Sequence, residues 1–338
     1  MANYAGPTHT SRWIWGLGAS LALVLWSMSA FAADLASWNE GPRKAAIIDF
    51  VRGVAQPGSD RFVPVEQRVA VLDNDGTLWS EQPVYFQLFF ALDRARELAA
   101  ADPSWASTPA LKAAAAGDVK SLKAGGEKAL LELLTATHSG TTVQNFTASA
   151  RDWIATAHHP VTGRKYTDMV FQPMLELLDY LRANDFSVYI VSGGGVDFMR
   201  AFAENLYGVP PENVIGSLGK ARFEIVDGVP EVLKDPDIAF IDDKGGKPVG
   251  IVRHVGRRPI FVAGNSDGDL PMAQWSAAGD GPRFTMFVHH TDGEREFAYD
   301  RKSHIGTLDK ALNEARKRGW TVVDMKQDWK TVYPAAKP

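Results

Sequence analysis

The chain has 338 residues, of which 45% are apolar and none is cysteine, and its formal net charge is −4. The absence of cysteine excludes disulfide bonds and thiolate chemistry, and the mildly acidic balance argues against a nucleic-acid partner. A chain of this length and apolar content can bury a substantial core, and we expect two lobes.

The N-terminal segment, residues 1–32, predicts an export signal. An apolar stretch follows Arg12 up to about Met28, and residues 30–32 (Ala-Phe-Ala) place small side chains where a signal peptidase reads them. A membrane anchor is the alternative, but the stretch is short for a span and is interrupted by glycine and serine. We therefore expect cleavage after residue 32, a periplasmic or secreted protein, and no stable membrane anchor.

Residues 69–72 (Val-Ala-Val-Leu) predict a short buried strand that delivers Asp73 and Asp75 at its carboxyl end. Ligands of open α/β sheets collect at that edge. One carboxylate can attack a phosphoryl group while the other exchanges protons with the leaving oxygen, and both suit Mg²⁺. A plain Asp-Gly turn at Gly76 is the alternative. A calcium loop is excluded, because its glycine would stand two positions later.

More than one hundred residues of helical character separate this strand from the next one. Apolar residues recur at three-to-four spacing over 86–100, 117–137 and 143–157, and 172–184 reads as a crossover helix. This pattern predicts a doubly wound parallel α/β sheet with a helical domain inserted after the first strand. The expected boundaries are a core of 33–80 and 170–338 and an insertion of 81–169.

Three later segments supply further polar groups. Residues 187–192 predict a strand that ends at Ser192 and is followed by three glycines, and residues 243–248 form a basic stretch. Glycines let backbone amides approach an anion closely. Residues 259–264 predict another strand that runs into a carboxylate-rich loop. For the basic stretch, a solvated turn is the alternative.

The segment Asp73-x-Asp75-Gly76-Thr77 and these three later segments resemble the four motifs of the haloacid dehalogenase superfamily, in the same order. The resemblance spans residues 68–290 and is closest to the phosphoserine-phosphatase-like branch. It implies a helical cap over the active site, Mg²⁺ as cofactor, and hydrolysis of a small phosphate monoester through an aspartyl-phosphate.

The resemblance also implies roles for individual residues. Asp73 would be the nucleophile, and Asp75 would protonate the leaving alcohol and then activate water. Lys247 is preferred over Lys244 as the catalytic cation because of its Gly-Lys-Pro context, but both stay open. The remaining expected contacts to the phosphoryl group or substrate are Thr77, Ser192, Gly193, Gly194, Lys244 and Glu81.

The fourth motif departs from the family pattern, which commonly places a carboxylate directly after the glycine. This chain has Asn265 there, and an amide oxygen can bind Mg²⁺ without contributing charge. Beside Asp73 and Asp75, the expected metal ligands are Asp269 and one of Asn265 or Asp267. Replacing Asn265 by Asp is expected to strengthen Mg²⁺ binding.

Two other functions stay open on the sequence: a metal-free dehalogenase, against which Asp75 argues, and a catalytically weak protein that binds a phosphate ligand. His289 and His290 follow a strand-like run over 284–288, and we expect them to have core or loop roles. The identity of the substrate and the oligomeric state do not follow from the sequence.

Overall fold

The computed structural model describes residues 1–2 and 35–335, so the predicted export signal lies outside the described residues except for its first two. A seven-stranded sheet in the order β4-β3-β2-β1-β5-β6-β7 forms the centre of this part of the chain. Neighbouring strands are parallel except for β3 and β4, which form an antiparallel hairpin at one edge. The predicted fold class is confirmed. The strands are β1 Val69–Leu72, β2 Ser187–Gly195, β3 Val214–Val226, β4 Val229–Phe240, β5 Phe261–Gly264, β6 Phe284–His289 and β7 Thr321–Asp324.

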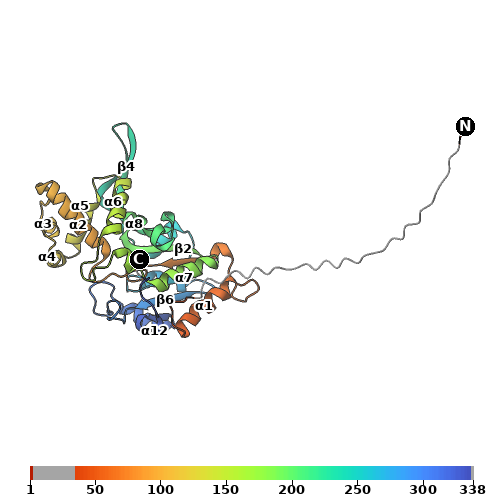
Figure 1. Cartoon of the computed structure of the whole chain (residues 1–338). Helices are drawn as coiled ribbons and strands as arrows, with labels where there is room; N and C mark the ends of the chain where they lie inside the picture. Colours follow the sequence, from red (N-terminus) through yellow and green to blue (C-terminus); the bar gives the residue numbers. More distant parts are fainter. Residues whose placement is uncertain (3–34, 336–338) are drawn as a thin grey trace. The chain divides into compact units, whose positions relative to one another are not determined.

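Helices cover both faces of the sheet and also form a separate group (Figure 1). None of the helices in the described part of the chain combines the length and the apolar content needed to span a bilayer. The helices are α1 Pro42–Ala55, α2 Phe86–Ala101, α3 Pro109–Ala115, α4 Val119–Ala124, α5 Gly126–His138, α6 Val143–Thr156, α7 Gln172–Ala183, α8 Val196–Arg200, α9 Ala203–Tyr207, α10 Gly246–His254, α11 Leu270–Ala277, α12 Lys310–Arg318 and α13 Met325–Asp328.

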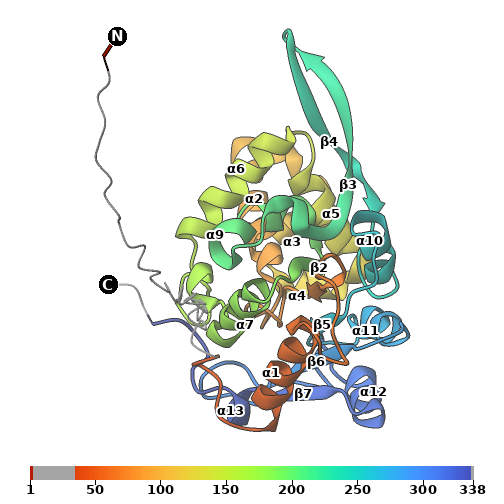
Figure 2. The same cartoon turned by 90° about the vertical axis from the view of Figure 1, so that its right-hand side faces the viewer.

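Strand β1 is short because it needs only to cross the middle of the sheet, and all four of its residues are buried. Its side chains alternate between the faces. Ala70 and Leu72 pack in the cluster that includes residues of α1 and α7, whereas Val69 and Val71 pack with residues of α10, α11 and α12. Figure 2 shows α10, α11 and α12 together on one side. A strand buried on both faces reads as a continuous apolar run, which is the pattern that residues 69–72 show.

The strand order reverses between β1 and β5, with β2 and β3 on one side and β6 and β7 on the other. At such a switch point the loops after neighbouring strands turn in opposite directions and leave a crevice for a ligand. The backbone N–H of Asp73 donates to the carbonyl oxygen of Ala263 at 3.0 Å, which extends the pairing of β1 and β5 to the edge of this crevice.

Helices α2 to α6, referred to here as the helical insertion, occupy most of the segment for which the sequence predicts a cap. The segment 117–137, for which the sequence predicts helical structure, forms two helices, α4 and α5, and Gly126 at the start of α5 has a φ of 65°. The positive φ suits glycine and breaks the helix. The insertion has an apolar cluster of its own, built around residues such as Leu92 and Leu133.

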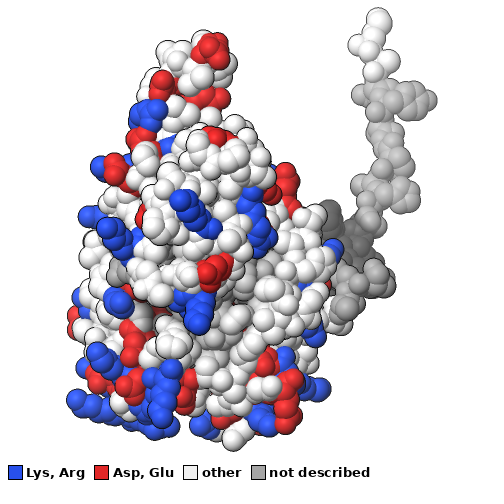
Figure 3. Space-filling model, turned by 90° about the vertical axis from the view of Figure 1, so that its left-hand side faces the viewer, with Lys and Arg blue, Asp and Glu red and all other residues white. Residues whose placement is uncertain are grey.

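The β3–β4 hairpin is a feature that the sequence analysis does not predict. Its outer part is solvated, with Phe223 68% and Ile225 62% exposed, so it lacks the one-sided apolar alternation of a half-buried strand. Basic and acidic side chains are interspersed on the face drawn in Figure 3. Closer to the sheet, the N–H of Lys234 donates to the carbonyl oxygen of Thr141 at 2.9 Å, which joins the hairpin to the helical insertion.

Candidate active site

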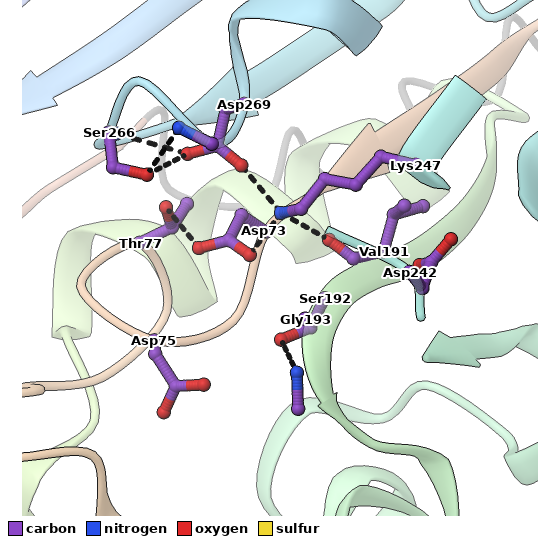
Figure 4. Close-up of polar contacts among 12 residues, drawn as sticks. Asp73, Asp75, Thr77, Val191, Ser192, Gly193, Asp242, Lys247, Ser266 and Asp269 are labelled. Atoms are coloured by element: carbon purple, nitrogen blue, oxygen red, sulfur yellow. Dashed lines mark hydrogen bonds and ion pairs between the residues drawn. The ribbon is translucent and has the colours of Figure 1, made fainter. Parts of the chain in front are cut away.

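A buried lysine lies between two carboxylates at the carboxyl end of β1 (Figure 4). The Nζ atom of Lys247 donates to Oδ1 of Asp73 and to Oδ1 of Asp269, each at 2.5 Å, and to the carbonyl oxygen of Val191 at 2.9 Å. These acceptors use all three hydrogens of the ammonium group. Because Lys247 is only 2% exposed, its charge acts on Asp73 with little screening by solvent.

The position of α10 decides between the two lysines. The helix begins at Gly246, so Lys247 lies in its first turn and reaches down to the sheet edge. Lys244 precedes the helix; its side chain is 76% exposed and its ammonium group lies 3.7 Å from Asp243. The structure therefore brings Lys247 into the site, and the expectation that Lys244 binds substrate is corrected, because this side chain lies in solvent.

The charge balance of this cluster favours a further cation. Burial, and then the charge of Asp269, raise the pKa of Asp73 well above its usual range, although Lys247 opposes the shift. Burial alone would lower the pKa of Lys247, but Asp269 and Asp73 outweigh it and raise that pKa. Two carboxylates thus share one ammonium group away from water, and the cluster attracts either a proton or a metal ion.

Asp75 lies on the turn after β1 and is not bonded to Lys247 (Figure 4). The indole Nε1 of Trp79 donates to Oδ1 of Asp75 at 2.8 Å and fixes the orientation of the carboxyl group. Burial raises the pKa of Asp75, with the hydrogen bond from Trp79 opposing the shift. A carboxyl group with a raised pKa can hold a proton and deliver it to a leaving oxygen.

The glycine-rich carboxyl end of β2 faces the same space. The N–H of Gly194 donates to the hydroxyl oxygen of Ser192 at 3.1 Å, and the N–H of Gly195 donates to Oε1 of Gln87 at 2.8 Å. Nε2 of Gln87 in α2 lies 3.0 Å from Nε2 of His138 in α5. Both helices of the helical insertion therefore help to hold the glycine-rich end of β2 in place. Sequence reasoning missed Gln87, because no local pattern marks a residue whose partner lies 108 positions away.

A second polar corner lies beside Asp73. The hydroxyl of Thr77 lies 3.3 Å from Oδ2 of Asp73 and 3.3 Å from Oδ1 of Asn265. Nδ2 of Asn265 donates to Oε1 of Glu81 at 2.6 Å, and the hydroxyl of Tyr299 donates to the same oxygen at 2.7 Å. Glu81 thereby fixes the amide of Asn265 so that its oxygen, and not its nitrogen, faces the hydroxyl of Thr77.

Side chains packed against the turn that carries Asp75 hold this turn in place. Gly76 has a φ of 72°, and a Cβ at this position would collide with the side chains of Asn265 and Glu81. Nε2 of His290 lies 2.7 Å from the carbonyl oxygen of Gly76, and its Nδ1 lies 3.0 Å from Glu296. The structure thus gives His290 a loop-holding role, in agreement with the expectation for this residue.

Two of the predicted metal ligands have other partners. Oδ1 of Asp269 is bonded to Lys247, and its Oδ2 accepts the N–H groups of Asn265 and Ser266, each at 3.0 Å. Oδ1 of Asp267 accepts the N–H groups of Asp309 and Ala311 at the start of α12. In the structure these carboxylates hold Lys247 and the backbone, and their role as metal ligands stays a prediction.

Among the described residues, no group of three or more histidine, aspartate or glutamate side chains is arranged to hold a metal ion. The donors that fit a hard cation are Oδ2 of Asp73 and Oδ1 of Asn265, which converge on the Thr77 hydroxyl. The excess of carboxylates over ammonium groups at this corner supplies the charge that a dication would offset. The carboxyl group of Asp75 is oriented by Trp79, and its role as a ligand stays a prediction.

A cavity of about 360 Å³ opens in front of these groups. Asp73, Asp75, Ser192 and Lys247 line one end of it, and Gly193, Gly194 and Glu81 also contribute to its wall. The structure therefore brings together most of the residues that the sequence assigns to catalysis and substrate binding. The other end lies under the helical insertion and beside the β3–β4 hairpin.

Comparisons with known proteins agree with this picture at the level of the family. A family model described as haloacid dehalogenase-like hydrolase matches residues 70–274. No curated protein matches the sequence. Among solved structures, a protein with unknown function from Bordetella pertussis Tohama I is similar, with 17% identity, a TM-score of 0.48, and coverage of 77% of this chain and 99% of that one.

Two further solved structures are similar at a comparable level. A functionally unknown protein from Anaerococcus prevotii DSM 20548 has 13% identity, a TM-score of 0.49, and coverage of 81% of this chain and 88% of its own. A phosphoserine phosphohydrolase-like protein from Francisella tularensis subsp. tularensis SCHU S4 has 15% identity, a TM-score of 0.37, and coverage of 74% and 99%.

Proposed function

Since the chain belongs to the haloacid dehalogenase-like hydrolase family, we propose that it is a magnesium-dependent phosphomonoesterase that forms an aspartyl-phosphate on Asp73. The observation that carries this proposal is the pair of carboxylates that line one cavity: Asp73 is held by Lys247, and Asp75 is free of it. A dehalogenase of this superfamily needs only the first carboxylate, so Asp75 favours phosphoryl transfer. The helical insertion would serve as the cap.

In the first half-reaction, a carboxylate oxygen of Asp73 attacks phosphorus and the bond from phosphorus to the leaving oxygen breaks. Asp75 gives its proton to that oxygen, so the product leaves as a neutral alcohol. In the second half-reaction, Asp75 takes a proton from water, the water oxygen attacks phosphorus, and the bond to Asp73 breaks. The cycle ends with inorganic phosphate and both carboxyl groups in their starting states.

Lys247 would hold Asp73 in position and offset the negative charge that builds up on the phosphoryl oxygens. Ser192 and Gly193, which line the cavity at the carboxyl end of β2, would contact those oxygens. Bound Mg²⁺ would neutralise part of the charge of the phosphate dianion, and Asp73 and Asn265 are the side chains that would hold it.

Export is a separate part of the proposal. The apolar stretch after Arg12 and the small residues at 30–32 support a cleaved signal peptide. The phosphatase would then act in the periplasm or outside the cell.

Removal of the metal tests the proposed activity. We expect the purified protein to release inorganic phosphate from an aryl phosphate in the presence of Mg²⁺, to lose this activity with a chelator, and to regain it when Mg²⁺ is restored. Chloride release from chloroacetate, unaffected by the chelator, would instead identify a dehalogenase. Tight binding of phosphate without turnover would identify a binding protein.

The contact between Asn265 and Glu81 changes what Asn265→Asp should do. An aspartate at 265 would face Oε1 of Glu81 across the present 2.6 Å contact, so the two groups must share a proton. Mg²⁺ would then compete with that proton, and the single variant should bind Mg²⁺ no better than the parent.

The paired variant Asn265→Asp/Glu81→Gln exchanges the amide and the carboxylate and keeps the hydrogen bond between them. It should need about tenfold less Mg²⁺ than Asn265→Asp for half of the maximal rise in melting temperature, because a charged ligand holds a hard cation more strongly than a neutral one. Asp267→Asn, which alters a carboxylate bonded to the start of α12, is the matched control and should leave the Mg²⁺ requirement unchanged. Stronger Mg²⁺ binding by Asn265→Asp alone would show that Glu81 does not oppose a charge at 265.

A further inference from the structure

The end of the cavity away from Asp73 has an apolar wall. Three leucines of α5 line it: Leu130, Leu131 and Leu134. Leu134 is a neighbour of both others on the helix surface, because it follows them by four and three residues. The opposite side comes from the base of the β3–β4 hairpin and the residue that follows it, with Leu218, Ile238 and Ile241. A wall of this kind stabilises an apolar ligand by removing its surface from water.

Two of these side chains are unusually open for isoleucine. Ile238 is 39% exposed and Ile241 is 48% exposed, although both line the cavity. Their apolar surface is therefore available to a molecule that extends outwards from the phosphate end. The cavity is continuous from Asp73 to this wall, so the group that reaches the wall is the alcohol part of the ester.

In the described lining of the cavity, no lysine is free to bind a second anionic group of the substrate. Lys247 is fully used by Asp73, Asp269 and Val191. Lys234, the other lysine of the described lining, is bonded to Asp197 and lies 4.8 Å from the centre of the Phe146 ring. A carboxylate or a further phosphate on the alcohol part would therefore meet apolar side chains and paired charges, which disfavours its desolvation.

We propose that the natural substrate is a phosphate monoester of an uncharged apolar alcohol, and that Ile238 and Ile241 contact this alcohol. This inference rests on the proposed phosphatase function and specifies its substrate class. It separates alkyl and aryl phosphates, which the wall fits, from phosphoserine and other phosphates with a second anionic group, for which the described lining has no unpaired lysine.

A series of n-alkyl phosphates from methyl to hexyl tests the inference, because the leaving alcohols differ little in reactivity and differ mainly in apolar surface. The value of kcat/KM should rise by about fourfold for each added methylene until the cavity is filled. Phosphoserine and glycerol phosphate should be poorer substrates than butyl phosphate. A flat or falling series, or a preference for phosphoserine, would overturn the inference.

Variants locate the effect within the cavity. Ile241→Asn and Ile238→Asn should reduce the gain to less than about twofold for each methylene, so kcat/KM for hexyl phosphate should fall much more than kcat/KM for methyl phosphate. Ile225→Asn is the matched control: this residue is on the same hairpin, is 62% exposed and does not line the cavity. An equal loss of chain-length preference in Ile225→Asn would contradict the assigned contacts.

Binding of n-alkyl phosphonates, measured by calorimetry, separates the inference from the proposed function. These compounds cannot be hydrolysed, and their affinity should rise with chain length in the same way. If affinity rises but no ester is turned over, the apolar site stands and the phosphatase proposal fails. If esters are hydrolysed and neither series depends on chain length, the phosphatase proposal stands and the apolar site fails.

Discussion

Asp73→Asn is expected to lower kcat by at least about 10⁴-fold, because an amide of nearly the same shape cannot attack phosphorus. The fold should survive the change. In the parent, the charges of Asp73 and Asp269 repel each other around one ammonium group, and the amide removes this repulsion while Lys247 keeps Asp269 as its partner. Phosphate release and thermal unfolding followed by circular dichroism measure the two effects, and we expect a melting temperature equal to or above that of the parent.

Asp75→Asn provides the matched comparison, since it makes the same chemical change two positions along the turn. This variant keeps the nucleophile and loses the group that protonates the leaving oxygen and activates water. With an aryl phosphate whose leaving group needs no proton, it should accumulate a phosphoenzyme that intact-mass measurement after acid quench detects. The phosphate should map to Asp73. Activity retained by Asp73→Asn with an unchanged fold would move the nucleophile to another residue.

Lys247→Met is expected to remove activity and also to destabilise the fold by about 3–5 kcal/mol, because it leaves two carboxylates buried without their shared cation. Both carboxylates belong to residues that are at most 6% exposed, so solvent cannot replace the ammonium group. Chemical denaturation of the parent and the variant at neutral pH measures the loss.

The double variant Lys247→Met/Asp269→Asn separates the two roles of Lys247. It removes one of the stranded carboxylates and should recover most of the stability, but it should stay inactive because Asp73 still lacks its cation. Lys244→Met is the surface control and should match the parent in both measurements, as its side chain is 76% exposed. Recovery of activity in the double variant would show that Lys247 serves only the fold.

The parts of the site that follow from local pattern were predictable from the sequence. An apolar run of four residues followed by Asp73 and Asp75 predicts a central strand with carboxylates at its end, and β1 has this form. The strand ending near Ser192 follows from the same reasoning, although β2 continues to Gly195. Such signals are readable because they depend on residues adjacent in the chain.

The choice between neighbouring polar residues could not be made in this way. Lys244 and Lys247 stand three residues apart, and only the start of α10 decides which one is buried. Asp267 and Asp269 differ by two residues, yet one is bonded to the start of α12 and the other to Lys247. Each outcome depends on an element packed from elsewhere in the chain.

The contacts of Glu81 could not be predicted from the sequence either, because they also depend on elements from elsewhere in the chain. Its partners Asn265 and Tyr299 lie 184 and 218 positions away. The β3–β4 hairpin was missed for a different reason, since its exposed outer part has no apolar face to mark it. The base of this hairpin forms part of the apolar wall of the cavity, so this wall could not be predicted from the sequence either.

The hairpin has one more consequence, which concerns how substrate enters. The helical insertion is joined to the sheet by two chain segments, and a joint of this kind alone would allow it to swing as a hinged domain. The hairpin adds a third tether: Gly140 and Thr141 exchange backbone hydrogen bonds with Lys234 at 3.0 and 2.9 Å, and the ammonium group of Lys234 lies 4.8 Å from the centre of the Phe146 ring in α6. Swinging the insertion away would break all of these contacts at once. We therefore expect the insertion to stay in place during turnover, so that substrates must fit the cavity as it stands rather than enter under a lid that swings open.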